Sequence, residues 1–137
     1  MAVRSAGEQA HGERLTTLRN GLLRLHKALL DSERHVYERD IRPVNSPWEM
    51  LGLVMNDPWF AWLRQLSGLV AEIDERLASR DPATHSEADD FIVRARGLLV
   101  PDEDGAGFER NYFEALQRDP NVVLAHADML SILASLA

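Results

Sequence analysis

The sequence predicts an all-α protein, an up-and-down bundle of four main helices with one or two short helices. Three observations support this class. Apolar residues recur every three or four positions over long segments, as on the buried face of an amphipathic helix. Helix start and stop signals, several of them containing proline, separate these segments, and no segment shows convincing strand alternation. The connections are short, which favours antiparallel neighbours.

The first long helix is predicted over about residues 13–40, where one apolar repeat persists until Arg42-Pro43. At 1.5 Å per residue it would be roughly 40 Å long. Gly21 lies toward the edge of its apolar face, where a missing side chain can allow another backbone to approach closely. Residues 1–12 are expected to be a disordered or frayed lead-in, and residues 13–137 a single domain.

The later elements follow from capping signals. Ser46-Pro47-Trp48-Glu49 resembles a capping box with proline at the first helical position, and it predicts a short helix. Asp57-Pro58 repeats the signal and begins the second long helix. Beyond the first helix, the predicted ranges are about 46–55, 57–81, 86–101, 108–119 and 122–136.

A polar stripe crosses the apolar face of the first predicted helix. Arg19, His26, Glu33 and Asp40 are spaced by seven residues among leucines, and Tyr37 lies on one flank of the same face. On a helical wheel, His26 and Glu33 point toward the core. Two turns, about 10.5 Å, separate them along the axis, so neither can easily serve the other. Because an unpaired buried charge is costly, both need partners from a facing helix or a second subunit.

Two residues are candidates for these partners. His126 lies on the expected inner face of the last helix, and Asp74 lies at the edge of the apolar face of the second long helix. One interpretation is a satisfied polar network that fixes helix register or lines a subunit seam. Another is a polar pocket in which a histidine carries protons and Glu33 acts as a general base. A third is that the first helix packs on a different face.

The segment 56–62 is the densest in aromatic residues. Trp59 and Trp62 fall on or near the core-facing arc of the second long helix, which predicts core packing or, alternatively, a shelf for a ligand. Phe60 points away from that arc. It is expected to be exposed unless the short helix near Trp48 or a partner covers it.

The sequence gives no basis for a metal ion or cofactor. The Glu-x-x-His pairs of carboxylate-bridged di-iron bundles do not occur. The acidic loop at residues 102–107 fails the EF-hand pattern at both ends, since Val100 and Asn111 occupy the first and twelfth positions. The chain also contains no cysteine, which excludes thiolate ligands and cysteine nucleophiles.

Charge and hydropathy narrow the expected partners. The formal net charge is −7 and the basic residues are scattered among acidic ones, which argues against nucleic acid or an anionic membrane. No apolar run has the length of a signal peptide or of a membrane span, so a cytoplasmic protein is expected. A homodimer is favoured, because the first helix outruns the others and would otherwise expose part of its apolar seam.

Three segments carry a resemblance to a known group of proteins. They are Leu25–Asp31, Ser46–Glu49 and the run Asn-Asp-Pro-Trp-Phe-Ala-Trp-Leu at residues 56–63. Here the chain resembles a family of uncharacterised small bacterial all-helical proteins, over roughly residues 14–77. The resemblance implies a small bacterial helical protein and no particular chemistry. The expectation about function rests on the other features of the sequence: we expect a non-enzymatic interaction, scaffold or small-ligand-binding protein, with an enzyme using a buried His/Glu acid-base site as the alternative.

Overall fold

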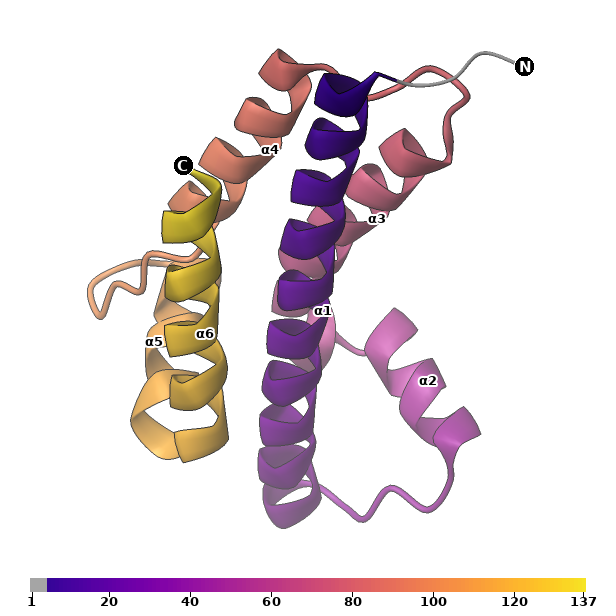
Figure 1. The fold of residues 1–137 in the computed structure, drawn as a ribbon. Coiled ribbons are helices and arrows are strands. Elements are labelled where there is room, and N and C mark those ends of the chain that lie inside the picture. The colour runs from indigo at the N-terminus through magenta and orange to yellow at the C-terminus, as the bar shows by residue number, and fades with distance from the viewer. Residues whose placement is uncertain (1–4) are drawn as a thin grey trace.

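The computed structural model describes residues 5–137, which form six α-helices and one 3₁₀ helix, η1, without a strand (Figure 1). The all-α class is therefore confirmed. The elements are α1 (Ala6–Asp40), α2 (Pro47–Asn56), η1 (Pro58–Leu63), α3 (Arg64–Ala78), α4 (His85–Leu98), α5 (Phe108–Arg118) and α6 (Pro120–Leu136). Helix α1 is central: α6 runs antiparallel beside it, and α3 packs on it as well (Figure 1). Helix α2 stands apart from the long helices (Figure 1).

Helix α1 begins earlier than expected. The predicted lead-in over residues 1–12 is wrong for residues 6–12, which form the first turns of the helix, and residues 1–4 lie outside the described part of the chain. The reason is a capping box, in which the Glu8 amide donates to Ser5 Oγ at 3.2 Å and the Ser5 amide donates to the Glu8 carboxylate at 3.0 Å. Arg14 also ties this end to α4 through a 2.8 Å ion pair with Asp89.

The second predicted long helix is divided in the structure. Asp57 accepts a hydrogen bond from the Trp59 amide and begins a 3₁₀ helix, η1, and the α-helical geometry of α3 starts only at Arg64. A 3₁₀ helix turns through about 120° per residue, so side-chain directions differ from those on an α-helical wheel. The prediction that Phe60 points away from the core is accordingly wrong, since it packs on Tyr37 of α1. Phe60 is completely buried, whereas Trp59 and Trp62 are only half-buried.

The core is built on the leucine face of α1. Five leucines of this helix have no exposed surface: Leu15, Leu18, Leu22, Leu25 and Leu29. Gly21 provides the close approach to α6, because a Cβ atom there would lie 2.6 Å from Met129 Sδ and 2.8 Å from Ile132 Cδ1. None of the helices formed by residues 5–137 is both long enough and apolar enough to cross a bilayer.

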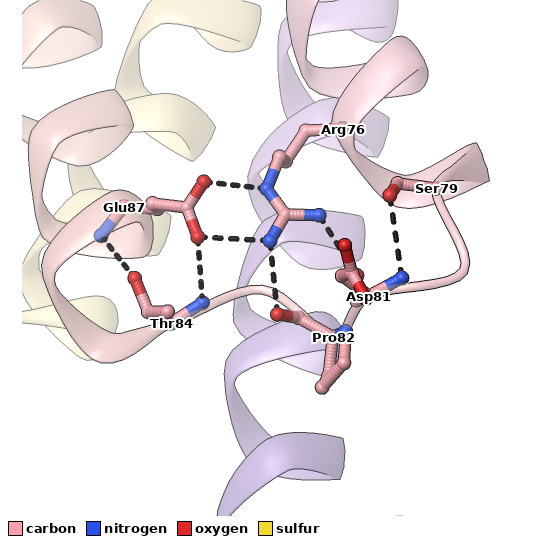
Figure 2. A network of polar contacts seen from close by, with 6 residues as sticks. All are labelled: Arg76, Ser79, Asp81, Pro82, Thr84 and Glu87. Carbon is pink, nitrogen blue, oxygen red and sulfur yellow. Dashed lines mark hydrogen bonds and ion pairs between the residues drawn. The ribbon is translucent and has the colours of Figure 1, made fainter.

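A polar clamp closes the corner between α3 and α4 (Figure 2). Arg76 donates to both carboxylate oxygens of Glu87, at 2.5 and 2.8 Å, and to the carbonyl oxygens of Asp81 and Pro82. Glu87 also completes a capping box with Thr84, so α4 starts at His85. Hydrogen bonding from Arg76 and Thr84 lowers the pKa of Glu87 to about 2. The clamp therefore sets where α4 begins and how it returns along α1.

Candidate functional site

The inward carboxylate of the polar stripe lies where three elements meet. Glu33 of α1 is only 6% exposed, and each of its carboxylate oxygens accepts a hydrogen bond. Trp59 Nε1 of η1 donates to Oε2 at 2.9 Å, and Arg118 of α5 donates to Oε1 at 2.6 Å. Arg118 Nε also donates to Ser32 Oγ at 3.1 Å. We call Ser32, Glu33, Trp59 and Arg118 the Glu33 cluster.

Aromatic rings cover one side of the Glu33 cluster. Tyr37, one turn further along α1, meets Trp59 edge-to-face at 5.7 Å and Phe60 at 5.6 Å between ring centroids. Tyr37 is buried, which places it beside the cluster as an apolar wall. Trp62 lies elsewhere, at 5.3 Å from Phe108 of α5. Two of the three predicted aromatic site residues, Tyr37 and Trp59, therefore adjoin Glu33.

The partners of Glu33 differ from those expected. Neither His126 nor Asp74 bonds to it, and its partners Arg118 and Trp59 were not predicted for this role. Arg118 occupies the last turn of α5, where a basic residue also suits the helix dipole, so its sequence position carries no sign of a buried contact. Only the packing of α5 against the end of α1 brings the two charges together.

The histidine of the stripe is isolated from this cluster. His26 is half-buried, and its side chain forms no hydrogen bond or ion pair with any residue in 5–137. Burial lowers the pKa of His26 below its ordinary value of 6.5, so the ring is neutral at pH 7. A neutral, unpartnered imidazole two turns from Glu33 does not form an acid-base pair with it.

Asp74 and the end residues of the stripe form separate ion pairs. Asp74 Oδ1 lies 2.5 Å from Arg19 Nε, which joins α3 to α1. Asp74 is thus a partner of the stripe, but of Arg19 and not of His26 or Glu33. Asp40, at the other end of the stripe, pairs with its neighbour Arg39 at 2.7 Å on the surface.

His126 belongs to a third polar contact. Its Nδ1 lies 2.5 Å from Tyr112 Oη, and the two rings meet at 5.3 Å between centroids. Burial raises the pKa of the Tyr112 hydroxyl and lowers the pKa of His126. Both directions favour a neutral phenol that donates to a neutral imidazole. This pair joins α5 to α6 and does not reach Glu33.

The polar residues among the predicted site residues therefore form three separate contacts within the described chain, and His26 stands outside all of them, as does the aromatic Trp62. Glu33 with Trp59, Arg19 with Asp74, and Tyr112 with His126 each join two helical elements. Across residues 5–137, no group of three or more histidine, aspartate or glutamate side chains is placed to hold a metal ion. The role that these contacts can serve is structural, because they fix the positions of η1, α3, α5 and α6.

A hollow on the surface lies between α1 and α2, and we call it the α1–α2 groove. Its volume is about 470 Å³, within the range of small-molecule sites. Its lining is largely apolar and is formed by Leu30, Asp31, Arg34, Asn45, Ser46, Pro47, Met50, Leu51 and Val54. Sequence reasoning did not single out this groove.

The outer side of α2 continues this apolar surface. Trp48, Leu51 and Met55 are 82%, 48% and 63% exposed, and their spacing of three and four residues places them on one helix face. We call these three residues the α2 stripe. Leu51 belongs to both the stripe and the groove, so the two are continuous. A signal for this surface was present in the sequence. Residues 47–56 are apolar on almost all sides of the helix, and a short helix at the edge of a bundle cannot bury that many apolar side chains.

Comparison of the sequence with family models, curated proteins and solved structures gives no significant match. The function of the chain is therefore inferred from its own geometry.

Proposed function

We propose that this protein is a non-enzymatic interaction protein that binds an amphipathic helical segment of another protein along α2. The observation that carries the proposal is the exposure of the α2 stripe beside the α1–α2 groove. A contiguous apolar surface of this kind on a folded domain is typical of a binding site. A groove floored by leucine, methionine and valine suits the apolar face of a helix, which inserts side chains spaced by three and four residues.

Helix α2 is held at both ends, so the groove exists before any partner binds. At its start, Ser46 Oγ accepts from the Glu49 amide at 3.1 Å, and the Glu49 carboxylate forms an ion pair with Arg42. At its end, Arg64 donates to the Met55 carbonyl oxygen at 2.7 Å. A preformed groove supports tight binding, because little ordering of the protein is needed on association.

Charges at the rim of the groove support a peptide partner. Asp31 and Arg34 contribute opposite charges to the lining on the α1 side, and Arg34 also pairs with Glu38 at 2.6 Å. A rim with both signs can orient a helix that carries charges on either flank of its apolar face. The acid-base alternative has less support, because both oxygens of Glu33 are engaged and neither His26 nor His126 contacts them.

The proposal is tested by selecting random helical peptides that bind the full chain and then measuring their affinity for variants. We expect selected peptides to share apolar residues at three- and four-residue spacing, and Trp48→Ala to weaken their binding at least tenfold. Val93→Ala is the control, because Val93 is an exposed apolar residue, 64% exposed, that lies on α4 and outside the α2 stripe. The control should bind as the wild type does.

Two outcomes would overturn the proposal. One is the recovery of no peptide above background, and the other is peptide binding that Trp48→Ala leaves unchanged. A small apolar probe, anilinonaphthalene sulfonate, distinguishes the remaining case. If no peptide is recovered, but the wild type binds the dye and Leu51→Glu does not, the occupant of the groove is a small-molecule ligand and not a peptide.

A further inference from the structure

A polar cleft on α1 adjoins the α1–α2 groove. It has a volume of about 260 Å³ and is lined by Asp31, Arg34, His35 and Glu38, and we call it the α1 cleft. Asp31 and Arg34 line the α1–α2 groove as well, so the two cavities are continuous. A helix whose apolar face occupies the groove therefore brings a side chain from the flank of that face to the cleft.

Asp31 is the charge at this junction that lacks a counter-charge. Its carboxylate forms no hydrogen bond or ion pair with any residue in 5–137. Arg34, in contrast, pairs through Nε with Glu38 at 2.6 Å and donates through Nη2 to the Val44 carbonyl oxygen at 3.4 Å. Lys27, one turn before Asp31 on α1, is exposed and forms no ion pair with it. The charge that is free to meet a partner is therefore negative.

The other groups of the α1 cleft add hydrogen-bond acceptors. His35 Nδ1 lies 2.7 Å from the Asp31 carbonyl oxygen. Since a carbonyl oxygen can only accept, Nδ1 carries the proton, and Nε2 of the neutral ring is an acceptor. Glu38 bonds to Arg34 through Oε1, which leaves its second oxygen without a partner in the described chain. The cleft thus contains two carboxylates and one guanidinium, with acceptors in excess of donors.

This arrangement suits a cation, because ammonium and guanidinium groups carry several donors and no acceptor. The cation must lie close to an apolar anchor of the bound helix, since Asp31 lines both cavities. On a helix this closeness corresponds to a spacing of three or four residues. The formal net charge of −7 also favours association with a basic partner over an acidic one.

We infer that the segment bound in the α1–α2 groove is a basic amphipathic helix, one lysine or arginine of which enters the α1 cleft and pairs with Asp31. The inference rests on the proposed function and adds the sign of the partner's charge. It makes Asp31 a specificity determinant. A helix with a carboxylate at the same position would meet Asp31 with a like charge and would be rejected.

A double-mutant cycle tests the pair. The probes are a peptide selected on the full chain and the same peptide with its conserved basic residue replaced by glutamine. Asp31→Asn should weaken binding of the basic peptide at least threefold and leave binding of the glutamine peptide nearly unchanged. Asp31 is exposed, so circular dichroism should show the same helix content in the variant and the wild type.

Asp128→Asn is the matched control. Asp128 is also an exposed aspartate without an ion pair in residues 5–137, but it lies on α6 and outside the groove and the cleft. The control changes the net charge by the same amount, so it reports any general attraction of basic peptides to an acidic protein. It should leave the affinity ratio of the two peptides as it is in the wild type.

A charge exchange gives a second test. Asp31→Arg should weaken the basic peptide further than Asp31→Asn does, and a peptide with glutamate in place of its basic residue should bind Asp31→Arg better than it binds the wild type. If the glutamate peptide shows no such preference, the pairing with Asp31 is wrong.

Failure of this inference differs from failure of the proposed function. Selected peptides that need Trp48 but share no basic residue, or whose affinity ratio Asp31→Asn leaves unchanged, would overturn the inference and leave helix binding in place. Recovery of no peptide would overturn the proposed function, and the inference with it.

Discussion

Arg118 donates a hydrogen bond to Glu33 across 85 residues of sequence, and this contact attaches the C-terminal end of α5 to the C-terminal part of α1. Trp59 completes the arrangement from η1, so neither oxygen of the carboxylate is left unpaired. A buried carboxylate held from two sides acts as a positional constraint, because any shift of α5 or η1 would leave a charge in an apolar surrounding.

Glu33→Gln should destabilise the fold by about 2 to 3 kcal/mol. The amide cannot accept from both Trp59 and Arg118, and it leaves the guanidinium partly buried without a counter-charge. Urea unfolding followed by circular dichroism measures the loss. Glu72→Gln is the control, since Glu72 forms an exposed ion pair with Arg94 and should change stability by less than about 1 kcal/mol. Equal midpoints for Glu33→Gln and the wild type would contradict a structural role for the cluster.

Gly21→Leu should destabilise the protein by about 1 to 3 kcal/mol, because the new side chain collides with Met129 and Ile132 of α6. Gly68→Leu on α3 is a matched control. Nothing lies within 4 Å of a Cβ atom at residue 68, so the better helix propensity of leucine should stabilise that variant by roughly 0.5 kcal/mol. Thermal melting of the two variants shows the difference, and equal shifts would exclude a close α1–α6 contact at Gly21.

The clamp between α3 and α4 should weaken in acid. The pKa of Glu87 is lowered to about 2 from an ordinary value of 4.5. A depressed carboxyl pKa contributes stability that is complete above the unfolded value and is lost as the pH falls from about 4.5 to about 2. The Glu87→Gln variant should lack this part of the acid transition. Glu75→Gln, on the exposed side of α3, should lose stability in acid as the wild type does. If Glu87→Gln also lost stability between about pH 4.5 and pH 2 as the wild type does, the role of the clamp would be contradicted.

His26 should make the fold sensitive to mild acid. Burial lowers its pKa from 6.5, so the folded protein binds a proton at this ring less readily than the unfolded chain does. Stability should therefore fall as the pH drops below 6.5 toward the folded pKa. His26→Gln should reduce this slope, and His35→Gln, at an exposed position on α1, should leave it unchanged. Melting temperatures between pH 7 and pH 5 provide the comparison.

Local signals in the sequence predicted much of the helical framework. The buried faces of α1 and α3 follow from apolar spacing, as Leu22 and Ile73 illustrate, and the start of α2 follows from a capping residue before proline. The same signal, Asp119 before Pro120, starts α6, but the prediction began that helix two residues later, at Val122. The inward direction of Glu33 was also predictable, because it depends only on the turn of the helix that carries it. These properties involve residues within a few positions of one another.

The partners of the polar residues were not predictable in this way. Asp74 faces Arg19, and the prediction matched it with Glu33 and His26, because a wheel shows the direction of a side chain but not its height along a neighbouring helix. The division of residues 58–78 into η1 and α3 was missed for a related reason. The burial of Phe60 against Tyr37 stabilises the 3₁₀ turn, and this contact comes from another part of the chain.

The sequence by itself thus determined where helices form and which faces turn inward, since hydrogen bonding and apolar periodicity act over one or two turns. The tertiary structure alone decided that Arg118 meets Glu33, that Tyr112 meets His126, and that α2 stands away from the bundle with its apolar stripe exposed. Those outcomes depend on the crossing and relative height of helices that are distant in the chain. The crossing and the relative height of two helices follow from the packing of whole helix faces and not from any local pattern.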